Sequence, residues 1–333
     1  MSGRDSAAPY SGSRCLVTGG LGFIGANLVH RLAGAGADVT VVDAEVASHG
    51  ANVHNIEGVA RPVDVIRASV GDTDAVGDAV AAADYVFNCA GQVSHLDSMR
   101  DPLGDLELNA RSHLALLELL RATNPGAPVV FTSTRQIYGR PKYFPVDEDH
   151  PVQPVDVNGV DKFAGEQYHV LYAHVHGMHA CSLRLTNTYG PRMRLRDDRQ
   201  GFVASFVRRA LTGDVITLYG DGSMERDMVH VDDVVEALLL AASTPASSGE
   251  VVNLGHPVSL TLAEVAHAIV DAAGSGTVEY VPWPPERAAI DIGNYKGDFT
   301  KARKLLGWEP AVDFAAGITA TVGFYREHRS WYL

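Results

Sequence analysis

The chain has 333 residues, of which 46% are hydrophobic and 20% charged, and its formal net charge is −13. This length fits about two domains of ~150 residues, and the acidic surplus disfavours nucleic acid or an anionic membrane as a partner. No apolar run approaches the ~18 residues of a membrane span, and three widely separated cysteines without metal-ligand spacing indicate a cytoplasmic protein with no metal site.

Short apolar runs alternate with helix-like segments through the first half of the chain, as in βαβ units on a parallel sheet. Residues 1–13 are small and polar, and we expect them to form a disordered tail. We predict strands at residues 14–18, 38–43, 65–69, 85–89, 129–132 and 180–185. We predict helices at residues 25–35, 75–82, 106–121 and 159–174. The expected fold class is therefore α/β, a doubly wound parallel sheet of the Rossmann type with six or seven strands.

The alternation breaks after Pro191. Residues 192–200 are rich in arginine and aspartate, which predicts a solvated, mobile loop. Further elements are predicted at residues 202–212 (helix), 215–219 (strand), 231–243 (helix) and 259–273 (helix, with a capping box from Thr261 and Glu264). We expect these segments to build a smaller α/β cap over the carboxyl edge of the sheet, where doubly wound folds bind ligands.

A glycine-rich turn joins the first strand to its helix. Gly19, Gly22 and Gly25 have the spacing G-x-x-G-x-x-G, and Phe23 and Ile24 open the helix. The glycines permit a tight turn, close approach of a pyrophosphate and close helix–strand packing, while the helix N-terminus offers free N–H groups to phosphate. The turn therefore predicts a dinucleotide site.

The end of the second strand indicates which dinucleotide binds. Asp43 stands there, eighteen residues after Gly25. A carboxylate at this place accepts hydrogen bonds from the ribose diol and repels a 2′-phosphate. Ala44 follows it and offers no arginine to such a phosphate. NAD is therefore favoured over NADP.

Several ordered motifs extend this pattern over most of the chain. They are TGGLGFIG (18–25), NCAG (88–91), LELNA (106–110), FTSTRQIYG (131–139), LRLTNTYGPR (184–192), RDMVHVDDV (226–234) and LGW (306–308). With them the chain resembles the extended short-chain dehydrogenase/reductase family, and within it the nucleotide-sugar epimerases and dehydratases. The resemblance implies an NAD-binding domain of residues 14–190 joined by 226–250, and a substrate-binding domain of residues 191–225 and 251–333.

The resemblance also implies the residues that surround the cofactor. Those expected beside the pyrophosphate, nicotinamide ribose or adenine are Ser69, Val70, Cys89, Ala90, Gly91, Val93 and Thr186. Asn109 would steady the adjoining backbone, and Lys162 would hold the ribose hydroxyls. Ser69 departs from the family, which usually has Asp there, so the adenine contact would be weaker.

For a nucleotide-diphosphate sugar, the resemblance implies a second set of residues. Arg226 and Arg287 would pair with the diphosphate through bidentate, charge-assisted hydrogen bonds. Asn187 would meet the phosphates or ribose, and Thr134 the sugar oxygen that becomes a carbonyl. Flanking the base would be Thr217, Leu218 and Tyr219.

The catalytic tyrosine of the family's Y-x-x-x-K motif is missing. Asn158 stands in its place, four residues before Lys162. An amide orients a hydroxyl but exchanges no proton near neutral pH. Other proton carriers proposed for the site are His95, Lys162, Tyr138 and a water held by Thr134 and Asn158. Either one of these replaces the tyrosine, or the activity has lapsed.

The segment after Thr134 separates the possible reactions. Related dehydratases and decarboxylases carry Glu there, whereas this chain has Arg135 and Gln136. The sequence thus favours NAD-dependent 4-epimerisation of a nucleotide sugar, although Arg135 makes a uronate substrate conceivable. The alternatives are another nucleotide-sugar oxidoreductase or dehydratase, and an NAD-binding sensor or scaffold without catalysis. By resemblance the protein is a homodimer that pairs helices 106–121 and 159–174, a surface also suggested by the leucines between residues 114 and 120.

Overall fold

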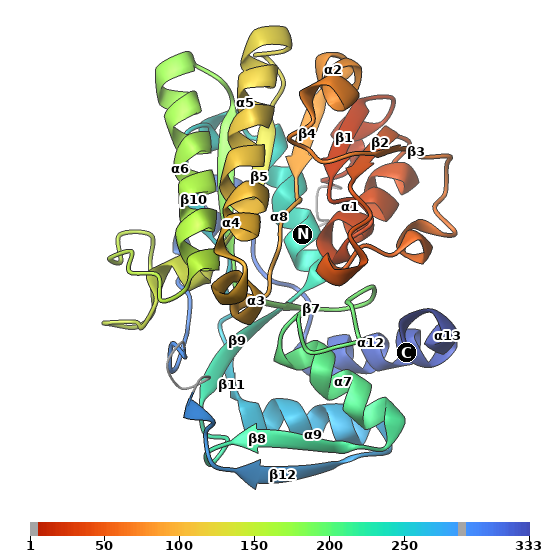
Figure 1. Cartoon of the computed structure of the whole chain (residues 1–333), viewed down its shortest axis with the longest axis vertical. Helices are drawn as coiled ribbons and strands as arrows, with labels where there is room; N and C mark the ends of the chain where they lie inside the picture. The colour runs from red at the N-terminus through yellow and green to blue at the C-terminus, as the bar shows by residue number, and fades with distance from the viewer. Residues whose placement is uncertain (1–5, 286–290) are drawn as a thin grey trace.

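The protein is built around one parallel sheet of seven strands (Figure 1). The computed structural model describes residues 6–285 and 291–333. The strand order is β10-β6-β5-β4-β1-β2-β3. The strands are β1 (Arg14–Thr18), β2 (Asp38–Asp43), β3 (Asp64–Arg67), β4 (Tyr85–Asn88), β5 (Val129–Thr134), β6 (Ala180–Leu185) and β10 (Val251–Asn253). The Rossmann-type prediction is confirmed, and the reversal of strand order between β1 and β4 marks the edge where such sheets bind cofactors.

Alternating residues of each strand face two helical layers. On β1, Cys15 and Val17 belong to one buried cluster and Leu16 to another. The first cluster lies under α1 (Phe23–Gly34), α8 (Val231–Ser243) and α11 (Thr300–Leu306). The second lies under α2 (Thr73–Ala82), α5 (Ser112–Thr123) and α6 (Val157–His176). Both faces of the strands are apolar because helices cover both faces.

A smaller lobe follows the carboxyl edge of the sheet. Its helices α7 (Phe202–Thr212), α9 (Leu262–Ala273) and α12 (Phe314–Glu327) share a third buried cluster with a two-stranded sheet, β8 (Val215–Tyr219) and β12 (Thr277–Val281). Strands β7 (Asn187–Tyr189), β9 (Glu225–His230) and β11 (Ser259–Thr261) form a third sheet between the two lobes (Figure 1). The capping box of Thr261 and Glu264 at the start of α9 is present as predicted.

The connection from β4 to α5 is more elaborate than the single helix predicted over residues 106–121. Three short elements precede α5: α3 (His95–Arg100), α4 (Pro102–Leu106) and a π-helical turn, η4 (Glu107–Arg111). Ser94 and Asp101 cap α3 and α4 through their side chains. Figure 1 places α3 at the junction of the two lobes.

Three expectations about the organisation of the chain differ from the structure. From Ser6 onward the N-terminal segment packs on the sheet layer, and Tyr10 is fully buried with its hydroxyl donating to Leu239 O over 2.6 Å. Strand β10 extends the main sheet beyond the boundary placed at residue 250, and α11 packs beneath it. Met193 and Leu195 are buried, so the arginine-rich loop is anchored by apolar side chains between its charges. Among the described residues, no helix has the length and apolar character needed to cross a membrane.

The buried N-terminal segment yields a stability prediction. Tyr10→Ala removes a fully buried aromatic side chain and its hydrogen bond to Leu239 O, so we expect a loss of roughly 3–5 kcal/mol in unfolding free energy. Urea denaturation monitored by circular dichroism measures this loss. Tyr143→Ala, at a tyrosine that is 41% exposed, is the control and should cost far less. Equal losses in the two variants would contradict the packing.

Candidate active site

The glycine-rich turn leaves an open cradle at the carboxyl end of β1. Gly19 has φ +67°, and a Cβ atom on it would lie 2.8 Å from Ala90 N. A Cβ on Gly25 would collide with the carbonyl oxygen of Gly19. Helix α1 begins at Phe23 with Gly22 as its N-cap and no side chain over its first N–H groups. Free N–H groups at a helix start, beside backbone that only glycine allows, fit the pyrophosphate of a dinucleotide.

Asp43 is held at the end of β2 in a way that suits a ribose diol. Its Oδ2 accepts from Leu21 N over 3.0 Å and its Oδ1 from Glu45 N over 2.9 Å, which leaves an acceptor position on each oxygen. Burial raises the pKa of Asp43 despite these two N–H donors. The nearby Arg67 is committed to Glu45 over 2.9 Å, and Ala44 offers no charge to a 2′-phosphate. The geometry fits NAD.

The floor of the site is the backbone of Gly91 and Gln92. Asn109, in the π-helical turn, accepts from Gln92 N and donates to Gln92 O, both over 3.2 Å. A Cβ on Gly91 would lie 2.6 Å from Lys162 Nζ and from Asn109 Oδ1. Two helices therefore converge on one peptide, and only glycine fits between them.

Asn158 is a clamp on this same floor. Its Nδ2 donates to Gln92 O over 2.9 Å and to Asp105 Oδ1 over 3.2 Å, and the residue is 2% exposed. An amide nitrogen has two protons, and both are committed to the protein. Asn158 could therefore offer a ligand only its oxygen, which can accept from a sugar hydroxyl but cannot donate to a keto oxygen.

Lys162 lies one helical turn further along α6, directly beneath Gly91. Its Nζ donates to Thr132 O over 3.4 Å and lies 5.1 Å from the centre of the Phe131 ring. Burial lowers the pKa of Lys162 to about 8, partly offset by the negative charge of Asp105. An ammonium of this kind holds hydroxyl groups and gives up a proton near neutral pH more readily than an exposed lysine.

Two buried carboxyl groups meet beneath Asn158. Asp105 and Asp161 are 2% and 5% exposed, and the negative charge of Asp105 favours the protonated form of Asp161. Burial, and then Asp105 as a hydrogen-bond partner and a like charge, raise the pKa of Asp161 to about 7. Like-charged carboxylates in one site cannot both ionise without cost.

His95 opens helix α3 at the entrance to α6. Its Nδ1 lies 2.9 Å from Oδ2 of Asp156, whose side chain is fully buried. Asp156 caps α6 by accepting from Gly159 N over 2.7 Å, and it also accepts from Gln136 Nε2 over 3.0 Å. The sequence motifs do not contain Asp156, yet it connects the segment after Thr134 to His95.

The hydroxyl-bearing candidates differ in their placement. Thr134 ends β5 half-buried, and its Oγ1 accepts from Gln136 N over 3.1 Å, so the hydroxyl proton is available for a ligand oxygen. Thr186 is buried and donates to Asp227 Oδ1. Tyr138, considered as a proton carrier, lies in the core: it donates to Asn253 Oδ1 and accepts from Arg184 Nη1, and burial raises its pKa to about 12. That candidate is excluded.

On the other side of the cleft, arginine side chains gather around Asn187. Arg135 Nη2 donates to Asn187 Oδ1 over 2.9 Å, and its other terminal nitrogen is buried without a hydrogen-bond partner among the described residues. Arg226 is 6% exposed, donates to Glu225 O and lies 3.6 Å from Asp291 Oδ1. Burial, and then the charge of Arg135, lower the pKa of Arg226 to about 10. Two like charges held together favour an anionic ligand.

The remaining predicted residues are placed as follows. Val70 is buried in the helix-covered core, Ser69 holds Gly71 N, and Cys89, Ala90 and Val93 follow β4. Leu218 is 1% exposed in the core of the smaller lobe, whereas Thr217 and Tyr219 alternate with it towards the other face of β8. Arg287 lies outside the described residues.

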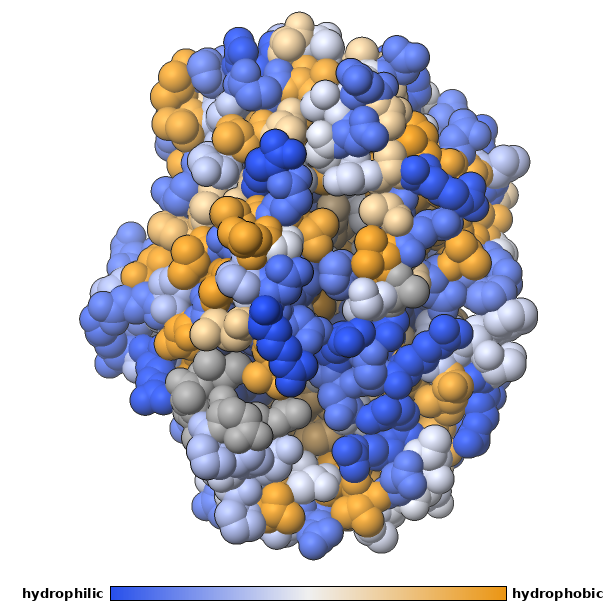
Figure 2. Space-filling model, viewed as in Figure 1, coloured by the Kyte–Doolittle hydropathy of each residue, from blue (hydrophilic) through white to orange (hydrophobic). Residues whose placement is uncertain are grey.

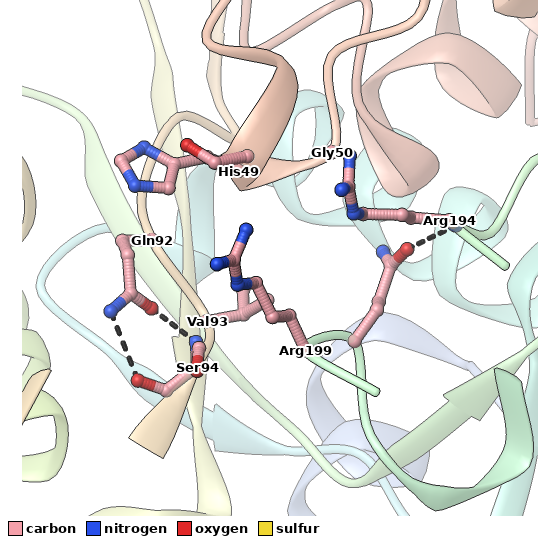
Figure 3. Close-up of a pocket in the computed structure, with 9 residues that line it drawn as sticks. His49, Gly50, Gln92, Val93, Ser94, Arg194 and Arg199 are labelled. Carbon is pink, nitrogen blue, oxygen red and sulfur yellow. Dashed lines mark hydrogen bonds between the residues drawn. The ribbon is translucent and has the colours of Figure 1, made fainter. Parts of the chain in front are cut away.

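A pocket lies where the loops after β2, β4 and β7 meet (Figure 3). The guanidinium groups of Arg194 and Arg199 point into it in Figure 3, opposite Gln92 and Val93. Arg199 reaches Asp97 of α3 over 2.9 Å, which ties the loop to the sheet domain. Sequence patterns missed this contact and the Asp105–Asp161 and His95–Asp156 pairs, because they join residues of different elements.

The acid pair yields a pH prediction. The pKa of Asp161 is about 7 in the folded protein and about 3.9 in an unfolded chain. The protonated carboxyl group therefore stabilises the fold fully below about pH 4, and this contribution is lost as pH rises through 7. Asp161→Asn should therefore raise stability at both pH values, and by about 1–3 kcal/mol more at pH 8.5 than at pH 5. Thermal unfolding at the two pH values measures this difference; Asp78→Asn, on α2, is the control. An equal gain in stability at both pH values would contradict the raised pKa of Asp161.

Comparison with known proteins agrees with this geometry. Residues 15–255 match the model of the NAD dependent epimerase/dehydratase family. The chain is 34% identical over 317 residues to a UDP-glucose 4-epimerase of Mycolicibacterium smegmatis, covering 94% of this chain and 98% of that protein. It is also 34% identical over 325 residues to a dTDP-glucose 4,6-dehydratase of Streptomyces griseus, covering 95% of each.

Solved structures show the same relationship. The UDP-glucose 4-epimerase of Thermotoga maritima, solved with UDP-glucose, is 32% identical, with a TM-score of 0.85 and coverage of 95% of this chain and 99% of that one. Its fold extends over both lobes of the present chain. The family match and the cradle for a dinucleotide together show that this chain belongs to the NAD-dependent epimerase/dehydratase family and uses NAD.

Proposed function

We propose that the chain is a nucleotide-sugar epimerase that inverts C4 through a transient keto-sugar, with a proton carrier other than tyrosine. One observation supports epimerisation above the other reactions of the family. The segment after Thr134 offers no carboxylate: Arg135 is bound to Asn187, and the Gln136 amide donates to Asp156. Dehydration and decarboxylation of a nucleotide sugar need a further base beside the ring. The related dehydratases and decarboxylases carry a glutamate for this purpose in the segment after the threonine.

Each side of the cleft contributes one part of the reaction. Bound NAD+ would accept a hydride from C4 of the sugar and return it to the opposite face. Lys162 would hold the nicotinamide ribose hydroxyls, and the Thr134 hydroxyl would donate to the sugar oxygen as it becomes a carbonyl. Because Arg226 is buried, Arg135 is half-buried and their charges interact, the two would hold the diphosphate against the net charge of −13.

A second substrate class has a specific observation in its favour. One terminal nitrogen of Arg135 is buried and lacks a hydrogen-bond partner among the described residues, and such a group costs free energy until an acceptor arrives. A uronate carboxylate beside the sugar ring would supply that acceptor. A sensor or scaffold without turnover is less favoured, because NAD binding alone requires neither Arg135 nor Arg226.

A substrate screen tests the proposal. We expect the purified protein with NAD to interconvert a C4 epimer pair when offered UDP-, dTDP-, GDP- and CDP-hexoses and UDP-glucuronate, and products are resolved by anion-exchange chromatography and NMR. Arg226→Gln should raise KM by at least about tenfold, since a bidentate charged contact to phosphate is lost. A 4-keto-6-deoxy product would assign dehydration instead, and NAD binding without turnover of any sugar would leave the scaffold reading.

We also propose a homodimer, through the helix 159–174 part of the expected surface and without the leucines of the other helix. Leu116, Leu117 and Leu120 of α5 are buried within the single chain and are not available to a partner. Exposed apolar side chains lie instead on and beside α6, at Val160 (51% exposed), Leu171 (51%) and Val175 (63%), and Figure 2 shows orange side chains along the edge where Figure 1 places α6. An apolar stripe of this kind favours helix pairing between two copies.

The dimer surface is tested by charge. Leu171→Glu with Val175→Glu should convert a dimer to a monomer in light scattering at micromolar concentration, because two carboxylates per copy would be buried on pairing. Val258→Glu, at a valine that is 54% exposed in the smaller lobe, is the matched control and should leave the mass unchanged. A dimer that survives the double substitution would rule out this surface.

A further inference from the structure

His95 has the surroundings of a base whose orientation is imposed by a carboxylate. Its Nδ1 lies 2.9 Å from Asp156 Oδ2, and its side chain is 38% exposed, whereas that of Asp156 is fully buried. The backbone around the ring is also held: Ser98 Oγ donates to His95 O over 2.8 Å and accepts from Asn158 N over 3.2 Å. The Nδ1 atom is therefore buried in contact with the carboxylate, without an aligned hydrogen bond to it, while part of the ring remains accessible.

Asp156 is kept as a carboxylate by several donors. Burial opposes its charge, but His95, Gly159 N and Gln136 Nε2 hold the pKa of Asp156 below its usual value. A buried carboxylate that contacts one ring nitrogen sets the tautomer of the imidazole and stabilises its protonated form. The other nitrogen, Nε2, is then the atom that exchanges protons.

The place of this pair in the fold connects it to the reaction site. His95 follows directly after Gln92–Ser94, the loop whose backbone Asn109 and Asn158 clamp beside the cofactor cradle. Asp156 is two residues before Asn158, and its partner Gln136 is two residues after Thr134. The pair thus connects the two segments that carry Thr134 and Asn158, which are expected to contact the sugar.

We propose that His95, oriented by Asp156, is the proton carrier that replaces the tyrosine missing at position 158. This inference rests on the proposed epimerase function and names the group that the reaction requires. His95 would be a catalytic residue, because in this proposal its Nε2 would contact the sugar hydroxyl, and Asp156 would be a positioning residue.

The proton balance is complete within this arrangement. As the C4–H bond breaks and its electron pair leaves with the hydride, neutral His95 Nε2 takes the proton from the C4 hydroxyl, and the carbonyl forms. The imidazolium is stabilised by Asp156. When the hydride returns to the other face of C4, Nε2–H gives its proton back to the same oxygen, so no further oxidant or base is consumed.

Other groups fit this task less well. Asn158 has both amide protons committed, and Tyr138 lies in the core. The Asp105–Asp161 pair has two members that are 2% and 5% exposed, beneath the clamp of Asn158, whereas the His95 ring is accessible.

The charged groups on the elements around α3 are Asp156, Asp161 and Lys162 of α6, Asp105 of α4, and Arg199, which reaches Asp97 of α3.

The first test combines kinetics with NMR on the NAD-loaded protein, with the nucleotide sugar that the screen identifies. His95→Gln should lower kcat by about 10²–10⁴-fold with little change in KM. Added imidazole should partly restore the rate of His95→Gly. Asp156→Asn preserves the α6 cap, because Asn caps as well as Asp, but removes the charge. In that variant kcat should fall with little change in KM, and the ring nitrogen signals of His95 in the NMR spectrum should show a changed tautomer balance.

The control is a matched pair outside the site. His54 Nδ1 contacts Glu57 Oε1 over 2.6 Å on the surface, and His54→Gln should change neither kcat nor its pH profile. If His95→Gln keeps the wild-type rate and pH profile while the wild type turns over, the inference is overturned but the epimerase function stands. An unchanged tautomer balance of His95 in Asp156→Asn overturns the pairing whatever the turnover. A wild type that converts no sugar overturns the proposed function itself.

Discussion

The site depends on one constraint, the clamping of the backbone at Gly91 and Gln92 between two helices. Asn109 binds both polar groups of Gln92, Asn158 shares its carbonyl oxygen, and Lys162 lies against Gly91. A buried peptide needs partners for both of its polar groups, so these contacts fix the loop that follows β4. The loop in turn carries His95 and borders the cofactor cradle. The π-helical turn at Asn109 allows that side chain to reach the loop without interrupting the helix.

Asn158 is best understood through this clamp. In the related motif a tyrosine at this place handles a proton, whereas here the side chain holds backbone and steadies Asp105. Its loss of acid–base capacity coincides with buried ionisable groups on every side: an acid pair beneath it, Lys162 one turn along, and the His95–Asp156 pair at the helix start. Perturbed ionisable groups concentrated at the cofactor edge are typical of sites that move protons.

Two arginine side chains at the cleft resolve a conflict between the negative net charge of the protein and the negative charge of its proposed ligand. A protein of net charge −13 repels a diphosphate at long range, yet the half-buried Arg135 and the buried Arg226 lie close enough for their charges to interact. Each is partly balanced, by Asn187 and by Asp291, so the pair is tolerable before a ligand arrives. Because burial weakens screening, two guanidinium groups at short range outweigh a diffuse surface charge of the opposite sign.

The sequence by itself determined the sheet, the NAD cradle, Asp43 and the absence of a tyrosine, because these follow from local patterns of glycine spacing and strand–helix alternation. It did not predict the buried Tyr10, the return of β10 and α11 to the sheet, or the exclusion of Tyr138 from the site, because burial depends on distant segments. The pairing of His95 with Asp156, of Asp105 with Asp161, and of Arg135 with Asn187 was decided only by tertiary structure. These partners are 61, 56 and 52 positions apart (95 to 156, 105 to 161, 135 to 187), and only the folded chain brings them together.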